Sequence, residues 1–180
     1  MKRIRSLAVL PAALLLTVPG ACALEITSAV PVVSGKRQTS DFVFSRSLAV
    51  KGIAFENGAV VMPVAVYKER EYADIRLLSK TLYGKLESCF SGDKCSYSGK
   101  ISAPKLSVLE VKTLKSRVRV ANVALSFDGD LSVVFGVLKK ISGGVRAAYP
   151  ENFEAKDPAL RDLIETKVKE GFAGAVDKKK

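Results

Sequence analysis

The sequence predicts an α+β fold in which an antiparallel β-sheet with two hairpins packs against one or two amphipathic helices and carries one disulfide. Two turn signals between β-rich segments, Asn57-Gly58 and Asp128-Gly129-Asp130, predict the hairpins. Asp157-Pro158 ahead of an apolar stripe predicts a helix start. We expect a signal peptide at residues 1–23 and one β-rich domain at 24–180, with residues 172–180 forming a flexible basic tail.

The N-terminus has the three parts of a secretory signal. Basic residues within positions 2–5 precede the apolar segment 7–18, and Ala21-Cys22-Ala23 forms an A-x-A cleavage motif. The apolar segment is short for a membrane span and contains a proline. The sequence therefore predicts cleavage between Ala23 and Leu24, with an uncleaved N-terminal anchor as the alternative.

Cys22 offers a different form of processing. Gly20-Ala21-Cys22 resembles the lipobox of bacterial lipoproteins, and the resemblance departs at Pro19, where a leucine-like residue is expected. Lipidation of Cys22, which would give an outer-membrane lipoprotein, is the alternative to a periplasmic or secreted protein that begins at Leu24.

The charge of the chain bears on its partners. The formal charge is +11, and removal of residues 1–23, which hold three basic and no acidic residues, lowers it to +8. A basic exported protein meets anionic envelope lipids and polymers, or another envelope protein, whereas export takes it away from nucleic acid. The simpler interpretation is that this charge only keeps the protein soluble.

Two cysteines remain after cleavage. An even count in an exported protein predicts a disulfide between Cys89 and Cys95. Their spacing is not the Cys-x-x-Cys of thiol oxidoreductases, and two thiols in a chain without histidine cannot complete an ordinary zinc site. We therefore expect a structural bond and neither a metal nor a cofactor.

The first half of the domain contains the first hairpin. Residues 26–33 read as an extended segment that Pro31 confines to a sheet edge or to a loop, and residues 34–41 read as a loop. In the hairpin over 48–67, the Asn57-Gly58 turn pairs Glu56 with Ala59 and Phe55 with Val60, while Pro63 marks an edge or a bulge.

Residues 69–90 change to a helical period. Apolar residues recur every three or four positions, which predicts an amphipathic helix; they are Tyr72, Ile75, Leu78, Leu82, Leu86 and Phe90. The alternative is a strand or two through Ile75 and Leu77. Glu69, Glu71 and Asp74 alternate with basic residues, which is typical of a solvated face.

The second hairpin spans residues 117–138, after a strand at 106–112 and a connection at 114–116. A three-residue loop at 128–130 pairs Phe127 with Leu131 and makes one continuous apolar face. The same register pairs Leu125 with Val133, Val123 with Phe135, and Ala121 with Val137. Residues before this stretch fall out of phase, which predicts a β-bulge near Ala121-Asn122.

The last part of the chain predicts the end of the sheet and a helix. Ser142-Gly143-Gly144 ends the sheet, and residues 149–156 are irregular. The helix then runs from Asp157-Pro158 to about Glu170. Its apolar stripe consists of Leu160, Leu163, Ile164 and Val168.

Two motifs suggest chemistry, and each has a plainer explanation. Ser91 and Lys94 match a Ser-x-x-Lys spacing, but they lie in a short loop without the companion motifs of such enzymes. Asp128 and Asp130 supply too few oxygens for calcium and fit a turn. The missing histidine removes Ser-His and Cys-His catalysis.

These observations favour a binding or accessory protein of the cell envelope that is not an enzyme. A structural component of an envelope assembly and a lipid-handling protein are the alternatives. The apolar strand faces would form either a solid core or a ligand groove. A hydrolase is the least favoured class.

Overall fold

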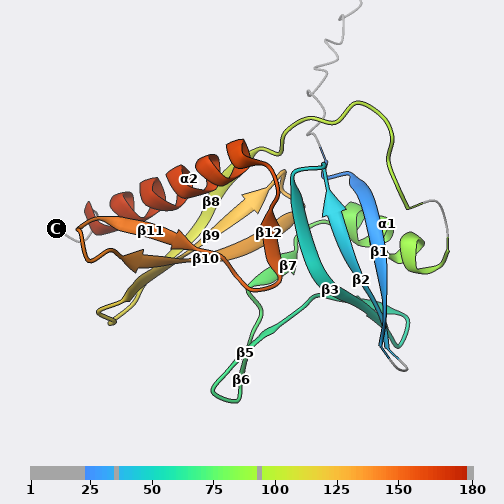
Figure 1. Ribbon diagram of the computed structural model, residues 1–180, viewed down its shortest axis with the longest axis horizontal. Coiled ribbons are helices and arrows are strands. Elements are labelled where there is room, and N and C mark those ends of the chain that lie inside the picture. The colour runs from blue at the N-terminus through green and yellow to red at the C-terminus, as the bar shows by residue number, and fades with distance from the viewer. Residues whose placement is uncertain (1–22, 35–36, 93–94, 178–180) are drawn as a thin grey trace, which may run out of the picture.

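The computed structural model describes residues 23–34, 37–92 and 95–177 (Figure 1). Three parts of the predictions lie outside these residues: the signal peptide as far as Cys22, the residue Lys94, and the end of the basic tail at 178–180. The described residues form mostly antiparallel β-sheets with two helices, so the α+β class is confirmed, although hairpins are more numerous than predicted. Neither helix combines the length and the apolar character that a membrane span requires.

The first sheet contains the N-terminal strands. Its order is β1-β2-β3-β12, and β4 pairs with β3 beyond this path. The bounds are β1 Ile26–Ser34, β2 Arg37–Phe44, β3 Leu48–Glu56, β4 Ala59–Val61 and β12 Phe153–Ala155. Pro31 lies in the edge strand β1, as expected of a residue that cannot donate a ladder hydrogen bond.

The loop predicted at residues 34–41 is wrong, because β2 occupies most of it and pairs with β1 on one side and β3 on the other. Phe42 and Phe44 in the second half of β2 are fully buried. This burial holds the strand in the sheet although its first half is polar, so tertiary packing outweighs local propensity.

The Asn57-Gly58 hairpin has the predicted register, with Glu56 opposite Ala59 and Phe55 opposite Val60. Both turn residues have positive φ, as a type I′ turn requires. β4 ends at Val61, before Pro63, so the predicted second strand is shorter than expected. The chain then forms a separate hairpin from β5 (Ala65–Tyr67) and β6 (Arg70–Tyr72), which projects from the body (Figure 1).

The helix predicted over 69–90 is wrong in its first half. Residues 70–72 form β6, and β7 (Ile75–Leu77) pairs with β10, which is the alternative considered from the sequence. The helix α1 covers Lys80–Phe90, and its N-cap Ser79 accepts a hydrogen bond from the Leu82 amide. Strand pairing of residues 70–72 and 75–77 and a cap at Ser79 together explain why the helix begins late.

The second sheet has the order β11-β10-β9-β8, with β7 also paired to β10. The bounds are β8 Leu106–Thr113, β9 Arg119–Phe127, β10 Leu131–Lys139 and β11 Val145–Ala148. All four pairs predicted across the second hairpin are confirmed, from Phe127 with Leu131 to Ala121 with Val137. The register then shifts so that Leu138 faces Arg119, which makes Val120 the extra residue of a bulge, one position before the predicted site.

Three predictions for the C-terminal part are wrong. Ser142-Gly143-Gly144 does not end the sheet, because it connects β10 to β11. The supposedly irregular residues 149–156 include β12, which pairs with β3. Helix α2 runs over Pro158–Asp177, past the expected end, so residues 172–177 of the predicted flexible tail are helical.

One hydrophobic cluster contains residues of both sheets and both helices. Phe153 of the first sheet joins them, because its ring centroid lies 5.6 Å from that of Phe127 and 5.5 Å from that of Phe135. Helix α2 contributes three buried residues of the predicted stripe, Leu160, Ile164 and Val168, whereas Leu163 is exposed. The apolar strand faces along the two hairpins therefore pack into a core.

Candidate functional site

The face of the second sheet opposite α2 carries an open groove of about 710 Å³. A Cβ atom on Gly171 of α2 would contact Val123, so α2 covers the face of the sheet to which Val123 projects. Successive residues of a strand project to opposite faces, and Asn122 therefore faces away from α2. The β5–β6 hairpin projects on that other side (Figure 1). We call this space the hairpin groove. It is lined by Ala65, Tyr67, Glu71, Tyr72, Ala73, Asp74, Arg76, Glu110, Lys112, Leu114, Arg119, Asn122, Ala124 and Val134.

Strand register builds the floor of the hairpin groove. Lys112, Asn122 and Gly136 lie opposite one another on β8, β9 and β10. In the next row of the same face, Glu110, Ala124 and Val134 are aligned in the same way. Residues directly opposite in a ladder project to one face, so Lys112 lies beside the polar Asn122, and Glu110 lies beside the small, apolar Ala124.

The bulge in β9 adds Arg119 to this face. In a regular strand, residues three apart project to opposite faces, but the extra residue Val120 returns Arg119 to the face of Asn122. The Nε atom of Arg119 donates a 2.8 Å hydrogen bond to Oδ1 of Asn122. Gly136 leaves room for the guanidinium, because a Cβ atom there would lie 2.8 Å from Nε of Arg119.

The wall of the hairpin groove comes from the hairpin and from the residues that follow it. Tyr67 and Tyr72 remain 64% and 43% exposed, which leaves large aromatic surfaces available for contact. The Val134 amide of β10 donates a 2.8 Å hydrogen bond to the Asp74 carbonyl, which anchors this segment to the sheet. The Arg76 Nε atom donates to the Ala73 carbonyl over 3.1 Å.

Asp74 is a lining residue of the hairpin groove whose pKa is raised. Desolvation by burial raises the pKa of Asp74, and the positive charges of Arg119 and, to a smaller extent, Arg76 only partly counter that effect. A half-buried carboxylate beside two guanidinium groups is an acceptor suited to a ligand N–H group or cation.

The charges of the hairpin groove balance. Its lining contains three basic residues, Arg76, Lys112 and Arg119, and three acidic residues, Glu71, Asp74 and Glu110. With two tyrosines and apolar residues between them, the lining suits a ligand that carries both polar and apolar groups. Among the residues that the structure describes, no group of three or more acidic or cysteine side chains is placed to hold a metal ion.

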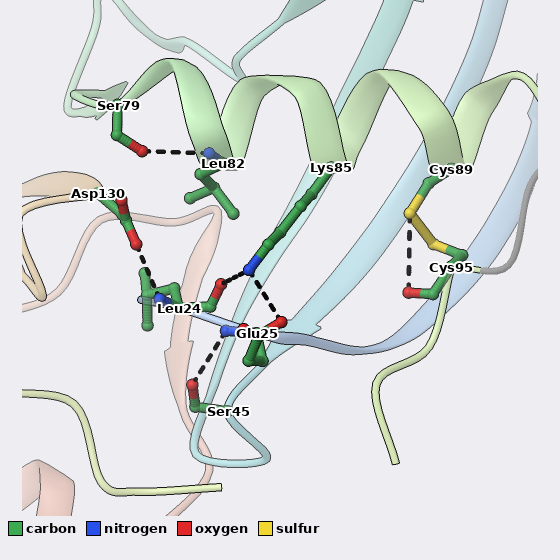
Figure 2. A network of polar contacts seen from close by, with 9 residues as sticks. All are labelled: Leu24, Glu25, Ser45, Ser79, Leu82, Lys85, Cys89, Cys95 and Asp130. Carbon is green, nitrogen blue, oxygen red and sulfur yellow. Dashed lines mark hydrogen bonds and ion pairs between the residues drawn. A yellow bond between two sulfur atoms is a disulfide. The ribbon is translucent and has the colours of Figure 1, made fainter. Parts of the chain in front are cut away.

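The cysteines expected to pair do so at a distance from the hairpin groove. The Cys89 and Cys95 sulfur atoms are bonded at 2.07 Å, which connects the last turn of α1 to the segment that follows it (Figure 2). Ser91, the serine of the Ser-x-x-Lys spacing, donates its hydroxyl hydrogen to the Glu87 carbonyl of the same helix end.

The two aspartates of the second turn have different partners. Asp128 accepts a 2.8 Å hydrogen bond from the Lys105 amide, and the buried Asp130 accepts one of the same length from the Leu24 amide. The structure therefore gives each carboxylate a partner in a different part of the chain, as stabilising contacts of the turn.

No sequence motif points to the hairpin groove. The alternating acidic and basic residues at 68–76 are typical of a solvated face, yet Glu71, Asp74 and Arg76 line the groove. The predicted bulge is the one sequence feature that could have indicated the groove. An extra residue in the strand brings the polar side chains of Arg119 and Asn122 to the same face of the sheet. Comparison of the chain with protein-family models, curated proteins and solved structures finds no match.

Proposed function

We propose that this protein is exported to the cell envelope and acts there as a binding or accessory protein, with the hairpin groove as its binding site. The single observation that carries the binding role is a 710 Å³ groove in which aromatic, apolar and oppositely charged side chains converge. The N-terminal sequence supports export, and the Cys89–Cys95 disulfide is of the kind found in oxidising compartments.

The lining favours binding over catalysis. The lining residues include no serine, threonine or cysteine, and the whole chain has no histidine to act as a base. Asp74 could accept a proton, but nucleophilic catalysis also needs an activated nucleophile beside the base. The residues suit recognition through hydrogen bonds, ion pairs and aromatic contact.

The balanced charge favours a polypeptide segment of another envelope protein as the occupant. An anionic polymer would meet Glu71, Asp74 and Glu110 as well as the three cations. A peptide segment with side chains of both signs can pair with both sets, and its apolar side chains can contact Tyr67 and Tyr72. This partner is one of the two classes expected from the sequence.

Site-specific photo-crosslinking in whole cells tests the proposal. A benzophenone amino acid replaces Tyr72 in the hairpin groove, and the control replaces Ile141, a fully exposed residue in the β10–β11 connection. We expect the Tyr72 position to give a discrete adduct with one envelope protein, identified by mass spectrometry. No adduct at position 72, or the same adduct from position 141, would contradict binding in the groove.

A charge variant refines this test. Lys112→Gln removes a cation of the hairpin groove, whereas Lys139→Gln makes the same change at an exposed position outside the lining. We expect the yield of the position-72 adduct to fall several-fold with Lys112→Gln and to stay unchanged with Lys139→Gln. Equal yields in both variants would show that the charges of the groove do not recognise the partner.

A second candidate function, the handling of anionic lipid, is favoured by a different surface. A cavity of about 600 Å³ lies between the β10–β11 connection and the C-terminal half of α2, where Phe172 and Val176 adjoin Lys140 and Lys169. Ile141 beside it is fully exposed. The lining holds two lysines and one carboxylate, Asp177, so an apolar surface with an excess of positive charge is available to an amphiphile with a negative headgroup.

Sedimentation with phosphatidylglycerol-containing vesicles tests the second candidate. We expect Ile141→Ser to lower the bound fraction, and Val66→Ser, at an equally apolar exposed residue of the β5–β6 hairpin, to leave it unchanged. Vesicles of phosphatidylcholine alone provide the neutral control. Binding that is absent, or equal for both lipid compositions, would contradict a lipid-handling role.

A further inference from the structure

The residue expected to begin the mature chain is buried against a carboxylate. Leu24 is fully buried, and its backbone nitrogen donates a 2.8 Å hydrogen bond to Oδ2 of Asp130 (Figure 2). Asp130 is itself only 6% exposed and lies in the turn between β9 and β10, 106 positions along the chain. The two residues thus join the beginning of the fold to its second sheet.

We infer that cleavage of the Ala23–Leu24 bond turns this contact into a buried ion pair between the new α-ammonium group of Leu24 and the Asp130 carboxylate. The inference rests on the proposed export. Hydrolysis adds water across the amide: the C–N bond breaks, a C–O bond forms at Ala23, and protons move to the Leu24 nitrogen. The products are the Ala23 carboxylate and the Leu24 ammonium ion.

The surrounding charges favour this pair. The Nζ atom of Lys85 on α1 lies 2.8 Å from Oε2 of Glu25 and 3.2 Å from the Leu24 carbonyl oxygen (Figure 2). Before cleavage, the group contains two carboxylates, Glu25 and Asp130, and one ammonium, that of Lys85. Cleavage supplies the second cation beside Asp130, so the group becomes neutral. A buried carboxylate is strongly stabilised by an opposite charge that also donates a hydrogen bond.

The burial of Leu24 also sets the order of events. A peptidase can cleave the Ala23–Leu24 bond only while this part of the chain is accessible, and in the folded structure Leu24 is completely buried. Cleavage therefore precedes the docking of Leu24 against the β9–β10 turn, and the pair forms as the mature chain folds. Lipidation at Cys22 would instead leave Leu24 within the chain and its nitrogen in an amide bond.

A comparison of two N-termini tests the ion pair. The full precursor is expressed with its signal in an exporting bacterial host, and the intact mass of the purified product identifies its first residue. A second precursor carries a glycine inserted between Ala23 and Leu24, so that the α-ammonium group moves to the glycine and Leu24 keeps its amide. Asp130→Asn is made in both, and Asp128→Asn provides a control in the same turn.

At pH 7 we expect Asp130→Asn to raise the unfolding equilibrium constant about 100-fold when Leu24 is the first residue, which corresponds to about 2.7 kcal/mol. In the glycine-extended protein the increase should be at most about 10-fold, because the Leu24 donor is then an uncharged amide, and the side-chain oxygen that remains in Asp130→Asn can still accept its hydrogen bond. Asp128→Asn should have the same effect in both proteins.

Two results would overturn the inference. The first leaves the proposed export intact, and the second also contradicts the predicted cleavage site. Equal effects of Asp130→Asn in both proteins, with Leu24 confirmed as the first residue, would exclude the ion pair and leave the proposed export intact. A product that begins at Met1 or at a lipidated Cys22 would exclude the pair together with the predicted cleavage site.

Discussion

Arg119 and Asn122 share one face of β9 although they are three residues apart, and the Nε atom of Arg119 donates a 2.8 Å hydrogen bond to Oδ1 of Asn122. Val120, the extra residue of the bulge, makes this possible by shifting the phase of the strand. The bulge thus brings a cation to the floor of the hairpin groove, where the regular strand would direct it to the opposite face.

The space above Gly136 determines where the Arg119 guanidinium lies. In Gly136→Ala the new Cβ would approach Nε of Arg119 to 2.8 Å, so the flexible side chain must move. We expect the Arg119–Asn122 hydrogen bond to be lost, with faster solvent exchange of the Arg119 Hε proton in NMR spectra. The unfolding free energy should change by less than about 1 kcal/mol, because the far end of an arginine adapts at low cost.

Gly174→Ala is the control for that variant, since nothing lies within 4 Å of a Cβ atom at this helical position. It should leave Hε exchange unchanged and stabilise the protein by up to about 1 kcal/mol through helix propensity. Slow Hε exchange that persists in Gly136→Ala would contradict the assigned position of the guanidinium.

The Cys89–Cys95 disulfide restrains the unfolded chain. In Cys89→Ser/Cys95→Ser we expect the unfolding free energy to fall by roughly 2 kcal/mol, the value for a short loop in the chain-entropy model. Urea unfolding of the oxidised wild type and of the double variant measures this difference. Dithiothreitol should destabilise the wild type and leave the variant unaffected; an equal response of both proteins would exclude the bond.

We expect Asp74 to make the stability of the protein depend on pH. Burial raises the pKa of Asp74 in the folded state, so its ionised form destabilises the fold relative to the neutral form. Asp74→Asn should therefore raise the melting temperature at pH 7. The gain should shrink as the pH falls through the raised pKa, and disappear below the unfolded value of about 3.9, where Asp74 is protonated in both states.

Measurement of melting temperatures between pH 3 and pH 7 checks this dependence. Asp162→Asn, an exposed position on α2, is the control and should show no comparable gain. A destabilising effect of Asp74→Asn at pH 7 would show that the attraction of Arg119 and Arg76 outweighs burial.

The sequence predicted correctly those elements in which the preferences of neighbouring residues and the burial of apolar side chains favour the same structure. Asn57-Gly58 and the three-residue loop at 128–130 fix strand register through turn geometry, and both registers are confirmed. Asp157 accepts a hydrogen bond from the Ala159 amide at the start of α2, as an N-cap should. In these places no distant contact had to be known.

The failures occur where distant pairing decides the structure. Strand β2 has a polar first half and is held by β1 and β3, and β12 becomes a strand only because β3 lies beside it. Tyr72, Ile75 and Leu78 fit a helical period equally well, but β7 finds its partner in β10, far along the chain. The hairpin groove was missed for the same reason, since it joins residues 65–76 to three strands beyond residue 105.

We propose that the chain acts outside the cytoplasm as a disulfide-bonded binding protein, and the intact mass of the native product tests this role most directly. Fractionated cells should yield the protein in the envelope or periplasmic fraction, beginning at Leu24, with Cys89 and Cys95 resistant to alkylation until reduced. A cytosolic product that retains Met1 and alkylates at both cysteines without reduction would contradict it.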